Sequence, residues 1–153
     1  MTDILFYHLS RSPLERALPE LLEKSLERGW RAVVRGNDPA RLEWLDRKLW
    51  LGGGSFLPHG LAGGRHDALQ PVLLTSETSA ANRPDILFVV DDAAVTPDEI
   101  PAFQRVCVVF DGNNVASLEH ARGQWKSLTE AAFAAKYWSE SDGRWQMKAS
   151  KNT

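Results

Sequence analysis

The chain has little from which to build a disulfide framework, a membrane span or a metal site. Its 153 residues include a single cysteine, Cys107, which lies in an apolar run and is interpreted as a small buried residue. The apolar runs fall short of the roughly 18 residues of a membrane span, and the four histidines lack zinc-ligand spacing. No basic region precedes an apolar stretch at the N-terminus, so we expect no signal peptide and a cytoplasmic location.

An excess of positive charge is also lacking. The chain has 18 Lys and Arg against 20 Asp and Glu, a formal net charge of −2, which argues against a broad electrostatic grip on nucleic acid. Cations are nevertheless more frequent near the C-terminus, since residues 122–151 contain six Lys and Arg and three Asp and Glu. An ordinary solvated face explains this cluster as well as a binding surface does.

The hydrophobic pattern predicts a single α/β domain over residues 1–153. Apolar runs near residues 4–8, 30–35, 71–75, 85–90 and 105–110 are typical of strands, and helical periodicity follows the first, second and last of them. Strand–helix alternation implies right-handed parallel crossovers. We therefore predict a mixed, largely parallel sheet flanked by about three helices, with a Rossmann-like topology.

The ends of these elements carry further signals. Ser12 and Glu15 have the spacing of a capping box around Pro13, although Pro19 should kink the first helix or delay its start to Leu18. Residues 136–138 and 144–147 flank a turn and predict a terminal hairpin. We expect the last few residues to be disordered.

A nucleotide site is not supported. Residues 51–70 contain six glycines, but the run at residues 52–54 follows a predicted helix and precedes Ser55 and Phe56, whereas a P-loop follows a strand and needs a lysine. No Gly-x-Gly-x-x-Gly follows the first strand. A connection this long is typically functional or mobile. It holds Phe56 and Pro58 and directly follows a second large aromatic residue, Trp50.

Two other kinds of function remain open from the residues alone. Asp111, Asn113 and Asn114 stand at a strand end and a helix start, where an α/β enzyme could bind phosphate or metal, although turn and cap chemistry is the favoured explanation of these residues. The sequence offers no candidate nucleophile for catalysis, because it has no Gly-x-Ser-x-Gly elbow and burial disfavours the thiolate form of Cys107. Direct binding of single-stranded DNA by the six tryptophans is disfavoured by the overall acidity.

Several segments together resemble the chi subunit of bacterial DNA polymerase III holoenzyme. The sharpest is Ser-Phe-Leu-Pro-His-Gly at residues 55–60. The others are residues 29–34 (Gly-Trp-Arg-Ala-Val-Val), 45–50 (Leu-Asp-Arg-Lys-Leu-Trp), 83–86 (Arg-Pro-Asp-Ile) and 121–126 (Ala-Arg-Gly-Gln-Trp-Lys). Their order across one short chain gives the resemblance its specificity.

The resemblance implies a non-catalytic accessory subunit of the clamp-loader assembly in DNA replication, without cofactor, metal or nucleotide site. It implies two protein partners, which are a psi subunit or its equivalent and the acidic, phenylalanine-ended tail of single-stranded-DNA-binding protein. Contact with DNA is then indirect, membrane association is not expected, and the subunit alone is monomeric.

The resemblance also assigns residues to the two partners. Trp50, Phe56 and Pro58 correspond to the surface for psi or a competing helicase. Arg122, Trp125 and Lys126 correspond to the tail-binding helix, where their spacing makes them neighbours. Some members have a further cation where this chain has Leu118 and Glu119. This departure predicts weaker tail binding or a contribution from Lys136 and Lys148.

Overall fold

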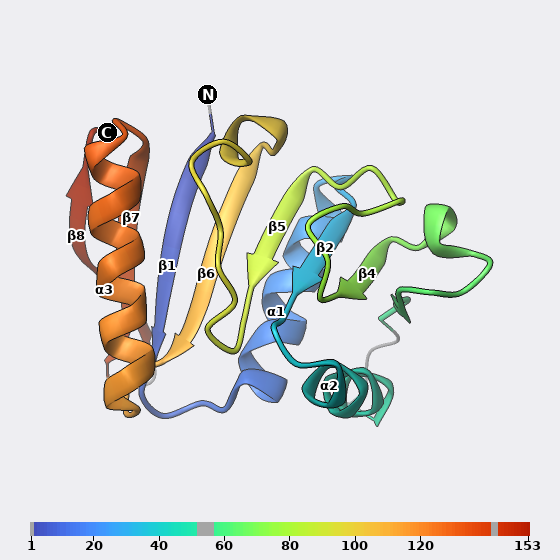
Figure 1. Cartoon of the computed structure of the whole chain (residues 1–153). Coiled ribbons are helices and arrows are strands. Elements are labelled where there is room, and N and C mark those ends of the chain that lie inside the picture. Colours follow the sequence, from blue (N-terminus) through green and yellow to red (C-terminus); the bar gives the residue numbers. More distant parts are fainter. Residues whose placement is uncertain (1, 52–56, 142–143) are drawn as a thin grey trace.

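The computed structural model describes residues 2–51, 57–141 and 144–153 (Figure 1). Within them, eight strands form one sheet in the order β3-β4-β2-β5-β6-β1-β7-β8, and the β7–β8 pair is antiparallel while the other pairs are parallel. The strands are β1 (Asp3–Leu9), β2 (Ala32–Arg35), β3 (Gly60–Leu61), β4 (Val72–Thr75), β5 (Ile86–Val89), β6 (Arg105–Asp111), β7 (Ala134–Ser141) and β8 (Arg144–Lys151).

Helices cover both faces of the sheet. Helix α3 (Val115–Glu130) lies in front of the β1–β7 side in Figure 1, while α1 (Leu14–Glu27) lies behind β2 and β5. Each face has its own apolar cluster, and α2 (Pro39–Leu51) contributes to the same cluster as α1. The predicted α/β class, with a mixed, largely parallel sheet and three helices, is confirmed.

The central strands form because their apolar runs can be buried on both sides. Every residue of β5 is buried, and so are residues 106–110 of β6. Cys107 is among them, as predicted, and its burial raises the pKa of the thiol to about 12. A neutral thiol in an apolar strand is a packing residue, so this cysteine offers no nucleophile at neutral pH.

The first helix differs from its predicted start. It begins at Leu14, not near Leu18, and continues through Pro19. The capping box is also wrong, because Pro13 is the N-cap and the Ser12 hydroxyl donates instead to Glu140 Oε2 at 2.7 Å. Proline removes one helical hydrogen bond, but Leu18 and Leu22 are fully buried and this packing holds the helix.

The other two helices agree with their predicted faces. Leu42, Leu45 and Leu49 are buried on α2, and Asp38 Oδ1 accepts from the Ala40 backbone N–H at its start. On α3, Ala121 and Leu128 are buried, while Leu118 and Trp125 pack half-buried against the same cluster. Asn114 caps α3 by accepting from Ser117 N at 3.0 Å.

The predicted long loop is partly ordered into secondary structure. It holds the two-residue strand β3 and a short 3₁₀ helix, η1 (Asp67–Leu69), and a second 3₁₀ helix, η2 (Ile100–Ala102), precedes β6. The terminal hairpin is confirmed as β7 and β8, with a bulge. Where we expected disorder, β8 continues to Lys151, and the Asn152 side chain donates to the carbonyl of Thr129 in α3 and to that of Phe133, which follows the helix.

Candidate partner-binding sites

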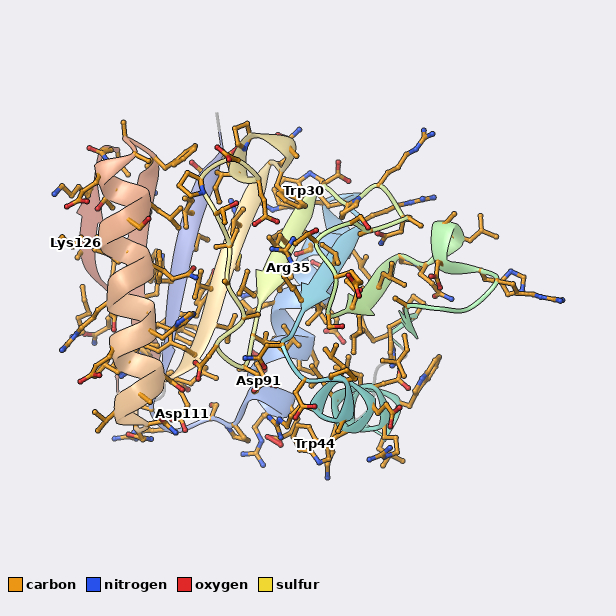
Figure 2. The ribbon with its side chains drawn as sticks, viewed as in Figure 1. Trp30, Arg35, Trp44, Asp91, Asp111 and Lys126 are labelled. Carbon is orange, nitrogen blue, oxygen red and sulfur yellow. The ribbon has the colours of Figure 1, made fainter. Side chains whose placement is uncertain are left out.

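The outer side of α3 presents the first candidate site. Arg122 and Lys126 are exposed and form no ion pair in the part of the chain that the structure describes, which leaves both charges available to a partner. Trp125 lies beside them but turns inward, with its ring 5.4 Å from Phe6 and 6.0 Å from Tyr137 in edge-to-face contacts. Figure 2 shows Lys126 on the side of α3 that is nearer to β8.

The two cations predicted from the hairpin separate onto opposite faces of the sheet. Lys148 Nζ donates to Gln146 Oε1 at 3.2 Å, and Gln146 pairs with Ser139, which alternation places on the α3 side. Lys136 pairs with Leu5, whose side chain packs in the α1–α2 cluster. The structure therefore brings Lys148, and not Lys136, to the same face as Arg122.

A polar cluster next to Arg122 was not anticipated from the sequence. The Tyr137 hydroxyl and His8 Nδ1 are hydrogen-bonded at 2.6 Å, and the His8 ring also contacts Phe110. Burial, followed by the charge of Arg122, lowers the pKa of His8. A neutral imidazole leaves Arg122 as the local positive charge. No signal in the sequence indicates this pair, because its two residues are 129 positions apart and meet only through the strand order.

The second candidate site is at the end of α2. Trp50 is 51% exposed and its ring centroid lies 4.2 Å from that of His59, while Leu51 is 80% exposed. His59 is buried, with Nδ1 at 2.7 Å from the Leu57 carbonyl and Nε2 at 3.1 Å from the Asp46 carbonyl. These contacts of His59 fix the backbone of residues 57–59, which includes half-buried Pro58. Phe56, the third predicted residue, lies outside the described residues.

Residues 1–136 match the family described as DNA polymerase III chi subunit, HolC. The chain belongs to the DNA polymerase III chi subunit family. The matched segment ends at Lys136, so it includes both candidate sites except Lys148. Most of the terminal hairpin lies beyond it. A search of curated proteins found no match.

Family membership makes this chi-family chain an accessory subunit of the replicative polymerase. In the described residues, no helix is both long and apolar enough to cross a membrane. The same residues contain no group of three or more His, Cys, Asp or Glu side chains placed to hold a metal ion.

The chi-family chain keeps a crevice at the carboxyl ends of its strands, where α/β proteins commonly bind ligands. The crevice has a volume of about 560 Å³ and its lining includes Asp91, Asp92 and Asp111 (Figure 2). Asp91 forms two hydrogen bonds with Arg41, and Asp92 accepts from Ser117 Oγ. So many carboxylates at one end of the sheet disfavour a phosphate.

The residues predicted for an enzyme site in this crevice have local structural roles. Asp111 Oδ1 accepts from the Asn113 backbone N–H at 2.9 Å, and the Asn113 side chain donates to the Ser10 carbonyl. Asn114 is occupied as the cap of α3. These contacts agree with turn and cap chemistry, so the geometry gives the enzyme hypothesis no support.

Proposed function

We propose that this chain is a non-catalytic adaptor that links the clamp loader to single-stranded DNA coated by its binding protein. The observation that carries the proposal is the pair of exposed cations on α3, Arg122 and Lys126, without ion pairs among the described residues. Membership of the chi family supports a place in the polymerase assembly. The acidic tail of single-stranded-DNA-binding protein is the proposed ligand of this site.

The tail's chemistry suits the outer side of α3. Its carboxylates need cations, which Arg122 and Lys126 supply from one helix face, with Lys148 on the same side of the sheet. Its terminal phenylalanine needs apolar contact, which half-buried Leu118 and Trp125 offer one turn to either side of Arg122. The proposed site excludes Lys136, which lies on the other face of the sheet.

Calorimetry with a peptide of the tail's last ten or so residues tests this site. We expect micromolar binding that weakens with salt, and a loss of about tenfold or more in the Arg122→Ala/Lys126→Ala double variant, because two partner charges disappear. Lys136→Ala is the matched control, and its tail affinity should equal that of the wild type. Unchanged affinity in the double variant would refute the proposed tail site.

A second proposal concerns the end of α2. We propose that Trp50 and Pro58, together with Phe56, bind a psi-like subunit or a helicase that competes with it. A large aromatic side chain that is half exposed beside a buried histidine is the type of residue that dominates binding energy at interfaces. The site lies at the opposite side of the sheet from α3, so both partners can be bound at once.

Pull-down from native lysate, with mass spectrometry of the captured proteins, tests the second site. We expect Trp50→Ala and Phe56→Ala each to lose clamp-loader or helicase subunits, by about tenfold or more for Trp50→Ala. Val115→Ala, which removes an apolar side chain that is 71% exposed at the start of α3, is the control. If Trp50→Ala folds normally and captures the same replication proteins as the wild type, the assignment fails.

A further inference from the structure

The sheet face opposite α3 carries a set of aromatic side chains that neither proposed site uses. On this face Trp138 pairs in register with Tyr7 on one side and with Met147 on the other. Trp145 reaches Tyr7, with ring centroids 5.1 Å apart and planes at 75°. The three aromatic rings are half-buried against the α1–α2 cluster, so part of each ring remains accessible, and Met147 is 51% exposed. We call Tyr7, Trp138, Trp145 and Met147 the aromatic platform.

Cations border the aromatic platform along its α1 side. The guanidinium groups of Arg28 and Arg105 lie 5.0 Å and 5.4 Å from the centre of the Trp30 ring. With Lys24 and Tyr7 they line a cavity of about 80 Å³. Lys136 joins them from β7, since its partner Leu5 packs on this same face. We call Lys24, Arg28, Arg105 and Lys136 the cationic rim.

These charges are not neutralised within the described residues. None of the four cations of the rim has an ion pair there, and Arg105 Nε is buried without a hydrogen-bond partner. Three acids of α1, Glu15, Glu20 and Glu23, line a groove with Lys48. On β7, the acid near the platform is Glu140, and its carboxylate accepts hydrogen bonds from the backbone N–H groups of residues 10–12.

Cations next to partly exposed aromatic rings on a sheet face suit one class of ligand. Phosphate groups bind unpaired cations, and unpaired bases stack on aromatic side chains, whereas a duplex hides the faces of its bases. An acidic peptide would use the rim but leave most of the platform uncovered. Charge complementarity and ring chemistry therefore both favour a single-stranded polynucleotide.

We propose that this face binds single-stranded DNA, with backbone phosphates at the cationic rim and bases on the aromatic platform. The net charge of −2 had disfavoured such binding, but a net charge averages over the whole chain and does not describe the four cations that the fold gathers at the rim. The inference is independent of the proposed tail site, which is on the other face of the sheet. It would give the adaptor a direct contact with the strand next to the protein that coats it.

Binding of a fluorescent oligo(dT) to the whole chain, followed by anisotropy and by tryptophan quenching, tests the inference. Raising salt from 50 to 200 mM should weaken binding about tenfold, because roughly three phosphates release counterions. Lys24→Ala/Arg28→Ala should weaken binding about tenfold and reduce the salt dependence. Trp145→Ala should weaken it by a similar factor and remove much of the quenching, while Trp145→Phe, which keeps a stacking ring, should retain most of the affinity.

The matched control is Arg122→Ala/Lys126→Ala, which removes the same charge from the other face. It should leave oligo(dT) affinity unchanged and lose tail-peptide affinity, whereas Lys24→Ala/Arg28→Ala should do the reverse. The two proposals therefore fail separately. Equal weakening of oligo(dT) binding by both double variants, equally tight binding of duplex DNA, or no binding at 50 mM salt would each overturn the proposed DNA site.

Discussion

Replacing Arg35 by methionine is expected to lower the free energy of unfolding by about 3–5 kcal/mol, because it breaks a buried ion pair from one side. Arg35 ends β2 with 5% of its side chain exposed, and its Nη2 lies 2.7 Å from Glu99 Oε1. The same guanidinium donates to the carbonyls of Thr78 and Ala94. It thereby holds the connections that follow β4 and β5, which cover this part of the sheet without an α-helix.

Arg35 also governs the ionisation of its partner. Burial alone raises the pKa of Glu99, but hydrogen bonds from Arg35 and Thr96 outweigh it, and the net pKa is lowered. Without Arg35 the carboxylate keeps the cost of burial and loses the compensating cation. Methionine keeps an unbranched apolar side chain of similar length, so the substitution leaves no large cavity. The expected loss of unfolding free energy therefore measures the contribution of the charge and its hydrogen bonds.

Urea unfolding of wild type, Arg35→Met, Glu99→Gln and the double variant measures this coupling. The double variant should recover part of the stability lost in Arg35→Met, because no unpaired carboxylate remains. Arg47→Met, at an exposed arginine of α2 without an ion pair among the described residues, should change the stability little and serves as the control. A loss below about 1 kcal/mol in Arg35→Met would show that the two connections are held by other contacts.

Much of the fold was predictable because it depends on local patterns. The apolar runs of β5 and β6 are long enough to be buried on both faces, and periodic leucines on α2 lie on its buried side. Strand order was not predictable, since β5 and β6 separate β1 from β2 and these neighbours are set by packing between distant segments. The start of α1 was missed for a related reason, because tertiary burial of Leu18 outweighs the local cost of Pro19.

The candidate sites show the same division between local and distant determinants. Arg122 and Lys126 are neighbours on any helix, so their grouping followed from spacing alone. The face of Lys136 depends on which side of β7 packs under α3, and a shift of one residue reverses it. The hydrogen bond between His8 and Tyr137 joins residues 129 positions apart, and no local pattern indicates such a pair.

Replacing Glu140 by alanine is expected to lower the free energy of unfolding by about 2–3 kcal/mol at pH 7, because a charged acceptor of several hydrogen bonds is lost. Its Oε1 accepts from the backbone N–H groups of Ser10, Arg11 and Ser12 at 3.0, 3.2 and 3.1 Å. Its Oε2 accepts from the Ser12 hydroxyl at 2.7 Å. One side chain of the terminal hairpin therefore fixes the turn that leads from β1 into α1.

The contribution of this carboxylate should disappear in acid. Burial raises the pKa of Glu140, but the hydrogen bonds from Ser12, Arg11 and Ser10 outweigh it and the net pKa is lowered. A carboxyl group with a lowered pKa in the folded state stabilises the fold fully above its unfolded pKa of about 4.3. That stability is lost as the pH falls through the lower folded value, where the group takes up its proton.

Denaturant unfolding at pH 7 and near pH 3 separates the charge of Glu140 from its role as an acceptor. Glu140→Gln keeps one acceptor oxygen and loses the charge, so it should be less stable than the wild type at pH 7, and this difference should shrink towards pH 3 as the wild-type carboxylate takes up its proton. Glu130→Gln changes an exposed glutamate of α3 and should match the wild type at both values. An undiminished difference between wild type and Glu140→Gln in acid would contradict this account, because a protonated wild-type carboxyl can no longer supply the charge that distinguishes the two side chains.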